Sequence, residues 1–300
     1  MSRRFVTLDV FTRTALAGNP LAVVLDSEGL NGHAMQSIAR EFNLSETVFV
    51  CPPVDVKSRA SLRIFTPGRE LPFAGHPTVG AAVLLAIRDH GGQHGHVAFD
   101  LEEKVGLVPC SVEVESDGMG KAVFSLPRLP WSLGEAAHDL AVAQALSLKP
   151  GDIGFERHRP SVYSAGNGFS LVPVSGQDAL ARVRPDLGHW QGIRPADHPN
   201  VFVYTRQTSD AAHHYRARMF APDMGLGEDP ATGSAVAAFA GAIMEYDALD
   251  DGQHKLTIEQ GYEMGRPSQI DLHLTVEDGV LVKAAIGGSA VIVSEGSLRL

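Results

Sequence analysis

The stretch RIFTPGRELPFAGHPTVGAAVLLA, Arg63 to Ala86, determines how the rest of the chain is interpreted. Its first three residues predict the end of a strand, and the prolines and glycines after them predict a loop. From Val79 to Ile87 no side chain is polar. A helix that is apolar on every side is buried, and this one is too short to span a membrane. We therefore predict a loop that leads through His76 into a buried helix, whose free N–H groups suit a carboxylate.

A second copy of this pattern, RMFAPDMGLGEDPATGSAVAAFA, runs from Arg218 to Ala240. The motif x-Pro-x-x-Gly starts at His76 in the first copy and at Asp229 in the second, and an apolar helix follows each time. Shorter matches occur in the same order along the chain, at Gly18–Val24 with Gly166–Val172 and at Val48–Val50 with Val201–Val203. The short matches alone are also explained by chance. Together, colinear matches predict a duplicated domain.

The duplication predicts two domains, residues 1–128 and 129–300, with the last strand free to pack back on the first domain. Leu126-Pro127-Arg128-Leu129-Pro130 is the expected linker. Capping-box spacing at Ser132 and Glu135 predicts a helix from Ala136 to Leu146. Strand-rich segments around one apolar helix predict an α+β fold, in which each domain is a curved, mostly antiparallel sheet wrapped around a central helix.

The amino-acid composition and net charge exclude several classes of protein. Apolar residues make up 44% of the 300 residues and charged residues 20%, which is typical of a globular protein. The net charge of −10 without a basic cluster argues against nucleic acid and anionic membrane surfaces as partners. No apolar segment follows the Met-Ser-Arg-Arg start, so we expect no signal peptide and a cytoplasmic location. Two cysteines, Cys51 and Cys110, make no disulfide framework.

Glu46 lies in the sequence NLSET, at the expected entrance of the strand Thr47–Cys51. On pattern alone, an isolated glutamate at such a place is more often a solvated edge residue than a functional one.

His76 and Asp229 occupy matching places in the two repeats. If the domains pack about a pseudo-twofold axis, we expect both residues to face one cleft between them, close to Glu46. Asp229 before Pro230 also has the pattern of an N-cap, and we expect it to fill both roles. Histidine is a poorer cap and a natural acid or base, which favours a functional role for His76.

Ser234 follows Gly233 at the start of the second buried helix. Its hydroxyl and N–H groups suit a substrate carboxylate, and a small residue that fills a tight helix start is an equally good explanation. The histidines near residue 90 lie in a glycine-rich connection without a carboxylate or cysteine to complete a ligand set, so we expect no metal. No G-x-G-x-x-G sequence follows the first strand, so the sequence shows no sign of a nicotinamide site.

The chain resembles the PhzF-like (phenazine-biosynthesis isomerase) family over residues 4–293. The resemblance is carried by DVFTRTALAGNPLAVVLD, NLSETVFV, FTPGRELPFAGHPTVGAA and MFAPDMGLGEDPATGSA, with GRPS and IGGSAVIV near the end. It implies the diaminopimelate-epimerase-like fold, with two pseudo-equivalent domains, and suggests a homodimer.

The resemblance also assigns roles. It implies that Glu46 is the general acid/base, and it matches the family's histidine, aspartate and serine to His76, Asp229 and Ser234. Related racemases use two cysteines at the helix starts, where this chain has Gly80 and Ser234, so a two-cysteine mechanism is not expected. The predicted substrate-binding residues are Asn19, Gly75, Gly80, Gly233 and Ser234.

We therefore predict a metal- and cofactor-independent isomerase that moves a proton on a small carboxylated substrate, such as a dihydro-hydroxyanthranilate. A carboxyl group whose pKa is raised by a closed cleft can remove a proton at one carbon and return it at another. The alternative is a small-molecule binding protein that keeps the fold without turnover. Retention of Glu46, His76, Asp229 and Ser234 argues against this alternative.

Overall fold

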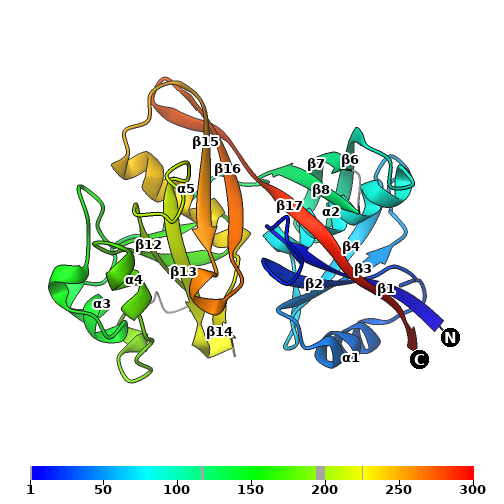
Figure 1. Ribbon diagram of the computed structural model, residues 1–300, viewed down its shortest axis with the longest axis horizontal. Helices are drawn as coiled ribbons and strands as arrows, with labels where there is room; N and C mark the ends of the chain where they lie inside the picture. The colour runs from blue at the N-terminus through cyan, green and yellow to red at the C-terminus, as the bar shows by residue number, and fades with distance from the viewer. Residues whose placement is uncertain (1, 116–117, 194–199, 225) are drawn as a thin grey trace. The chain divides into compact units, whose positions relative to one another are not determined.

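The computed structural model describes residues 2–115, 118–193, 200–224 and 226–300 (Figure 1). Its contacts divide the chain into two compact units, Met1–Pro127 with Gly287–Leu300, and Arg128–Ile286. The second unit ends at Ile286, and the last residues of the chain belong to the first unit. The reason is a long antiparallel pairing, in which the end of strand β17 runs beside the first strand of the chain from Val10↔Ala290 to Ser2↔Arg299.

The described residues of the first unit form eight strands and two helices before the chain enters the second unit. In chain order they are β1 Ser2–Val10, β2 Asn19–Val24, α1 Gly32–Phe42, β3 Glu46–Cys51, β4 Ala60–Phe65, β5 Glu70–Leu71, α2 Gly75–Asp89, β6 Gly95–Glu103, β7 Gly106–Glu115 and β8 Met119–Ser125. The end of β17, Val280–Arg299, completes this unit.

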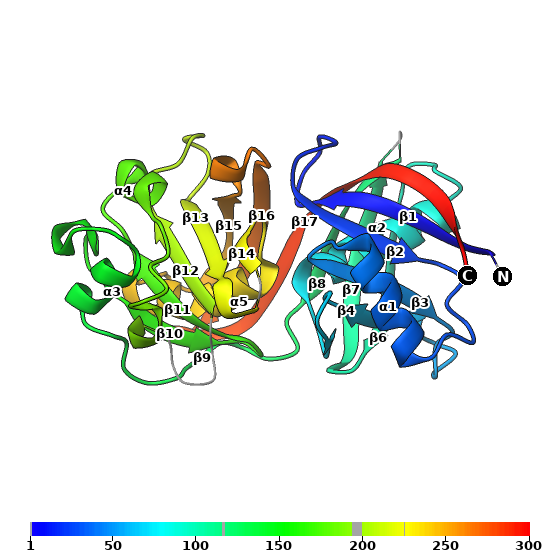
Figure 2. The same ribbon diagram turned by 90° about the horizontal axis from the view of Figure 1, so that it is seen from below.

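The sheet of the first unit closes on itself around helix α2. Strand β2 pairs with β1 antiparallel and with β3 parallel, and β4 pairs antiparallel with β3 and parallel with β6. Antiparallel pairings join β6 to β7 and β7 to β8, and β17 pairs with both β8 and β1. Helix α2 contacts β1, β2, β3, β7 and β8, while α1 lies against β3 and β4 (Figure 2).

Helix α2 is buried at every residue from Gly75 to Ile87, as its apolar sequence requires. Removal of this surface from water is a main source of stability for the unit, at about 25 cal/mol per Å² of apolar area. The amphipathic helix α1 buries only Met35, Ile38 and Ala39, and Asn31 caps it by accepting a hydrogen bond from the N–H group of Ala34 at 2.9 Å.

The described residues of the second unit combine strands that pair both parallel and antiparallel with one long helix and shorter ones. Its elements are β9 Trp131–Ser132, α3 Asp139–Ala145, β10 Ser161–Ser164, β11 Gly168–Pro173, α4 Gln177–Arg182, β12 Asn200–Thr205, β13 Tyr215–Ala221, β14 Leu226–Asp229, α5 Gly233–Tyr246, β15 Gly252–Gln260 and β16 Ser268–Glu277, with 3₁₀ turns at Pro150–Asp152, Trp190–Ile193, Pro222–Met224 and Tyr262–Met264. Helix α5 contacts β9, β10, β11 and β16.

The two units share one order of strand pairings. In the first, β2 runs parallel to β3, β3 antiparallel to β4, β4 antiparallel to β5 and parallel to β6, and β6 antiparallel to β7. In the second, β11, β12, β13, β14, β15 and β16 repeat the same sequence of parallel and antiparallel pairings.

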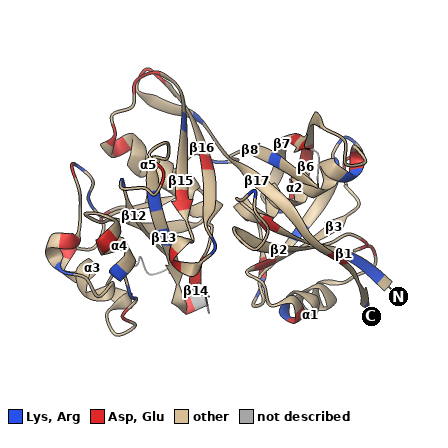
Figure 3. Ribbon diagram, in the orientation of Figure 1, with Lys and Arg blue, Asp and Glu red and all other residues tan. Residues whose placement is uncertain are grey.

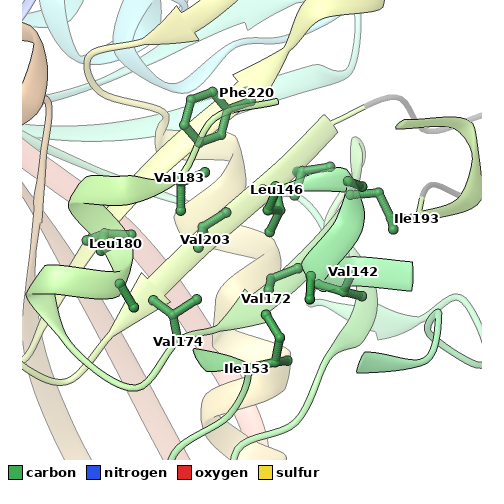
Figure 4. Close-up of a cluster of buried hydrophobic side chains, with 14 of the residues drawn as sticks. Val142, Leu146, Ile153, Val172, Val174, Leu180, Val183, Ile193, Val203 and Phe220 are labelled. Atoms are coloured by element: carbon green, nitrogen blue, oxygen red, sulfur yellow. The ribbon is translucent and has the colours of Figure 1, made fainter. Parts of the chain in front are cut away.

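A separate cluster of buried apolar side chains lies beneath α3 and α4 in the second unit (Figure 4). Val142 of α3, Leu146 directly after α3, Leu180 of α4 and Val203 of β12 belong to it. These short helices thus cover the face of the sheet that α5 leaves uncovered.

One local prediction was wrong. Ser132 does not cap a helix, because it lies in β9, and α3 begins only at Asp139 after His138.

Candidate active site

Glu46 is the first residue of β3, where the predicted strand entrance lies. Helix α1 ends just before it, and Asn43 adopts a left-handed conformation with φ of 51° that turns the chain from the helix into the strand. The backbone of Glu46 is then fixed beside Leu21 of the parallel neighbour β2. A carboxyl group at the end of a firmly paired strand has a well-defined position.

The side chain of His76 lies close to this carboxyl group. His76 Nδ1 is 3.4 Å from Glu46 Oε2, and 5% of the histidine side chain and 17% of the glutamate side chain are exposed. The structure therefore brings together these two predicted catalytic residues of the first unit, with the carboxyl group on the more accessible side. A separation of 3.4 Å is longer than a strong hydrogen bond and leaves the pair free to adjust to a ligand.

Burial lowers the pKa of His76 to about 3, so the imidazole is neutral at pH 7. The cause is desolvation, since the ring is almost completely buried beside the Glu46 carboxyl group. Nε2 of His76 is buried and has no hydrogen-bond partner among the described residues. A neutral imidazole with one unused nitrogen can donate one hydrogen bond to a bound molecule or accept one from it.

His76 lies in the first turn of α2, which begins at Gly75 after Ala74. Ala74 has no side chain that could cap the helix, so the N–H groups of the first turn lack a side-chain partner from that residue. Gly75 is buried at this helix start, where it was predicted to contact substrate.

Two buried residues behind the first turn were not predicted from the sequence. The hydroxyl of Thr78 lies 2.6 Å from Glu103 Oε1 and 2.8 Å from the carbonyl oxygen of Ala74. Burial raises the pKa of Glu103 to about 8, against the opposing hydrogen bond from Thr78. Glu103 thus anchors the turn that carries His76 from the far end of β6.

Asn19 and Gly80 lie deeper in the first unit. Asn19 begins β2 and is fully buried opposite Val10. Gly80 lies beyond the first turn of α2, and a Cβ atom there would come within 2.6 Å of Leu21 Cδ2 and 2.8 Å of Val10 Cγ2. Close packing of the helix against β1 and β2 explains this glycine.

Asp229 in the second unit is the last residue of β14 and is buried. It is not an N-cap, contrary to the prediction, because α5 begins only at Gly233 and Thr232 occupies the cap position. The chain therefore makes one more turn between Asp229 and the helix than between His76 and α2. The carboxyl group of Asp229 accepts a hydrogen bond of 2.6 Å from the Thr232 hydroxyl.

Gln260, the last residue of β15, holds this turn from the other side. Its Nε2 donates to the main-chain oxygen of Asp229 at 2.8 Å, and its Oε1 accepts from the N–H group of Thr232 at 3.0 Å. Gly233 is buried and Ser234 half-buried as the first two residues of α5. The structure thus gathers the three predicted residues of the second unit, Asp229, Gly233 and Ser234, at one helix start.

Charged residues flank this turn on neighbouring strands, as Figure 3 shows on β13 and β14. Arg218 of β13 makes two hydrogen bonds of 2.8 Å to the carboxylate of Glu228, the residue before Asp229. Arg218 also donates to main-chain oxygens of Leu180 and Val183, so the arginine is occupied in holding β14 in place.

The second unit holds another polar cluster at the opposite end of α5. His158 Nε2 lies 2.8 Å from Asp247 Oδ1 and its Nδ1 3.0 Å from the Tyr204 hydroxyl, and Arg206 and Tyr215 also bind Asp247. These contacts hold the side chain of Asp247, the cap residue at the C-terminal end of α5. Stabilisation of the helix explains this cluster.

No group of three or more His, Cys, Asp or Glu residues in the described part of the chain is placed to hold a metal ion. Within the same described residues, no helix is long and apolar enough to cross a membrane.

Comparison with known proteins gives the same family across nearly the whole chain. Residues 8–296 match the family model described as phenazine biosynthesis-like protein. The chain belongs to the phenazine-biosynthesis-like family. The predicted resemblance to PhzF-like proteins is confirmed.

Relatives in this family are named as isomerases. An uncharacterized isomerase of Mesorhizobium japonicum is 50% identical to this chain, and the trans-2,3-dihydro-3-hydroxyanthranilate isomerase of Pseudomonas aeruginosa is 33% identical; each alignment covers 99% of both proteins. The prediction that the chain is an isomerase is confirmed.

Solved structures agree with the fold. A PhzF-family phenazine biosynthesis protein of Bacillus anthracis superposes with a TM-score of 0.88 at 27% identity, and the match covers all of both chains. A hydroxyproline epimerase of Agrobacterium vitis shares the fold with a TM-score of 0.63 at 13% identity over 99% of this chain and 91% of that one. The fold is therefore the mixed-sheet fold of PhzF proteins and these epimerases.

Proposed function

We propose that this isomerase moves a proton between two carbons of a small carboxylated substrate and that Glu46 carries the proton. The observation that supports this most directly is the pairing of Glu46 with His76. A partly exposed carboxyl group lies 3.4 Å from a buried imidazole that is neutral at pH 7. Since the histidine is too weak a base to compete for the proton, the carboxyl group is the better acid/base of the two.

His76 and Asp229 orient the substrate in this proposal. The unused Nε2 of His76 is available to bind an amino, hydroxyl or developing enol group. Asp229 presents a buried carboxyl group of the kind that binds an amino or hydroxyl group. The starts of α2 and α5, at Gly75 and at Gly233–Ser234, supply N–H groups for the substrate carboxylate, with the buried Asn19 as a further predicted contact. The chemistry proposed here needs no metal or cofactor.

We infer further that the two units descend from a duplication. The repeated order of parallel and antiparallel pairings supports a common origin.

A dihydro-hydroxyanthranilate is the substrate class that we propose. The support is the relative from Pseudomonas aeruginosa, named for trans-2,3-dihydro-3-hydroxyanthranilate and 33% identical over 99% of the chain. Such a compound carries the carboxylate, amino and hydroxyl groups that these residues would bind.

The test is incorporation of deuterium from D₂O into trans-2,3-dihydro-3-hydroxyanthranilate, followed by mass spectrometry. We expect the wild-type protein to incorporate solvent deuterium and Glu46→Gln to lose this activity. Saturable binding of the compound by calorimetry without any exchange would instead favour the non-catalytic binding protein. If the protein neither binds this compound nor exchanges its protons, the compound is not the substrate.

We also propose a homodimer, since twofold dimers are the commonest oligomers and the family resemblance suggests one. Light scattering at micromolar concentration should report about twice the chain mass of 32.0 kDa. A single species at the chain mass would contradict the dimer.

A further inference from the structure

Gln260 uses its whole side-chain amide on the turn that carries Asp229. The residue is fully buried. Its Nε2 donates to the main-chain oxygen of Asp229 at 2.8 Å and to the Thr232 hydroxyl at 3.0 Å, and its Oε1 accepts from the N–H group of Thr232 at 3.0 Å. Both protons of the amide and its oxygen are therefore engaged on two residues of one turn.

These contacts fix the direction of the hydrogen bond between Thr232 and the Asp229 carboxyl group. Thr232 has a single hydroxyl proton, and its oxygen already accepts a proton from Gln260. The hydroxyl proton is thus directed at Asp229 Oδ2, at 2.6 Å. A hydrogen bond that is donated to a carboxylate is stronger than one between neutral groups, and the chain Gln260–Thr232–Asp229 holds the carboxyl group in one orientation.

The turn after β15 keeps Gln260 in this position. Gly261 has φ of +79°, and a Cβ atom there would lie 2.4 Å from the oxygen of Arg266 and 2.6 Å from the oxygen of Pro230. Only glycine fits between these two main-chain groups. Arg266 donates its N–H group to the Gly261 oxygen at 3.0 Å, and Ser268 then pairs with Gln260 across the hairpin.

This arrangement explains the GRPS sequence at residues 265–268, which the proposed catalytic residues leave without a role. Gly265 has φ of +69° and ends the short 3₁₀ turn, so the chain can return at Arg266 and Pro267 to Ser268. The GRPS turn therefore packs β15 and its last residue against the Asp229–Pro230 peptide.

We propose that Gln260 is a positioning residue that sets the orientation of the Asp229 carboxyl group through Thr232. A purely structural glutamine would need only its bonds to main-chain atoms. The bond to the Thr232 hydroxyl instead extends to the side chain of Asp229. The consequence for turnover rests on the proposed function, in which Asp229 binds substrate, whereas the consequence for the geometry of Asp229 does not.

The variants separate the hydroxyl relay from general packing. Gln260→Met keeps the length of the side chain and removes its hydrogen bonds. Thr232→Val removes the hydroxyl with little change of shape, and Thr232→Ser keeps the hydroxyl. Gln253→Met is the matched control, because Gln253 is exposed on the same strand.

The first readout needs no substrate. We expect the Thr232 N–H group to exchange with solvent at least about tenfold faster in Gln260→Met than in wild type or in Gln253→Met, because it loses its acceptor. Crystal structures should show the Asp229 carboxyl group rotated or in several orientations in Gln260→Met and Thr232→Val, and unchanged in Thr232→Ser.

The second readout is turnover of trans-2,3-dihydro-3-hydroxyanthranilate. We expect kcat/KM to fall roughly ten- to a hundredfold in Gln260→Met and Thr232→Val, from the loss of one or two buried hydrogen bonds, and to recover in Thr232→Ser. An unchanged Asp229 orientation and unchanged Thr232 exchange in Gln260→Met would overturn the positioning role. If wild type does not turn this compound over, the proposed substrate fails, and the exchange rate and the orientation of Asp229 still decide the role of Gln260.

Discussion

The Thr78 hydroxyl oxygen lies 2.6 Å from Glu103 Oε1 and 2.8 Å from the Ala74 carbonyl oxygen. One hydroxyl proton cannot serve both acceptors fully. The Thr78 hydroxyl is therefore shared between the carboxyl oxygen of Glu103 and the main-chain oxygen of Ala74, and it ties the start of α2 to the end of β6. Burial raises the pKa of Glu103 to about 8, against this hydrogen bond from Thr78.

Glu103→Gln should therefore reduce the loss of stability at alkaline pH. The carboxyl group has a pKa of about 8 in the folded protein and an ordinary value of 4.5 when exposed. The folded state binds the proton more tightly, so the free energy of unfolding falls as pH rises from about 4.5 to about 8. Glutamine does not titrate, and its amide oxygen can still accept the hydrogen bond from Thr78. Urea unfolding at pH 5.5 and 8.5 should show a smaller decrease for the variant than for wild type.

The matched control for this experiment is Glu113→Gln on the neighbouring strand β7, where the side chain is exposed. Its pH dependence should follow that of wild type. Equal losses of stability in wild type and Glu103→Gln between the two pH values would show that Glu103 is already ionised in the folded protein.

Glu46→Gln should abolish proton exchange and leave ligand binding largely intact. The amide keeps the shape and the capacity for hydrogen bonds, but it cannot take up and return a proton in this reaction. A general acid/base contributes on the order of 10²–10⁴ in rate, and Ser234→Ala should cost less if the serine only positions a carboxylate. Deuterium incorporation measures the rate, and calorimetry measures binding. Glu41→Gln, at an exposed site in α1, is the control, and exchange at the wild-type rate in Glu46→Gln would make Asp229 the leading candidate for the acid/base.

Gly80→Ala should destabilise the protein by about 1–3 kcal/mol through overpacking. Its Cβ atom would meet Leu21 Cδ2 at 2.6 Å and Val10 Cγ2 at 2.8 Å inside the core. Gly68→Ala is the control, since the nearest atom to its added Cβ is Thr66 Oγ1 at 3.8 Å. Thermal unfolding should show a lower Tm for Gly80→Ala alone. Loss of activity at an unchanged Tm would instead support Gly80 as a substrate contact.

The sequence predicts elements whose burial follows from local pattern. The apolar run after His76 can only be a buried helix, and Glu46 follows a helix and starts a strand because Asn43 and the Val-Phe-Val run lie on either side of it. The two copies of x-Pro-x-x-Gly locate both helix starts. These sequence patterns are local, so they predict the elements without knowledge of how the elements pack.

Contacts between distant residues were beyond the reach of such patterns. Gln260 meets Asp229 because β14 and β15 pair one after the other along the same edge of β13, where Ala217 is paired with Gln260 and Met219 with Asp229. The acidic pair Glu102-Glu103 predicts two surface residues. Only the register of β6 in the sheet shows that Glu103 is buried. Asp229 looked like an N-cap because a short-range pattern cannot distinguish a cap from a turn held by a remote side chain.

His76 gives the opposite pH dependence to Glu103. Burial lowers the pKa of His76 to about 3, against 6.5 for an exposed histidine, so the unfolded chain binds the proton more tightly. The free energy of unfolding should therefore fall as pH drops from about 6.5 to about 3. Each group contributes at most about 1.4 kcal/mol per pH unit. Between pH 4.5 and 6.5 the two effects oppose one another, which predicts the greatest stability from these two groups in that window.

His76→Asn should remove the part of the stability loss at acidic pH that comes from protonation of the imidazole. Asparagine does not titrate, and its amide can still donate a hydrogen bond toward Glu46. Urea unfolding at pH 4 and pH 6.5 should show a smaller loss of stability for His76→Asn than for wild type, and His33→Asn, at an exposed position of α1, should behave as wild type does. The neutral state of His76 is what leaves Glu46 as the acid/base in the proposed reaction. If His76→Asn and wild type lose the same stability between these pH values, the imidazole is not held neutral by burial, and the assignment of the proton to Glu46 loses its support.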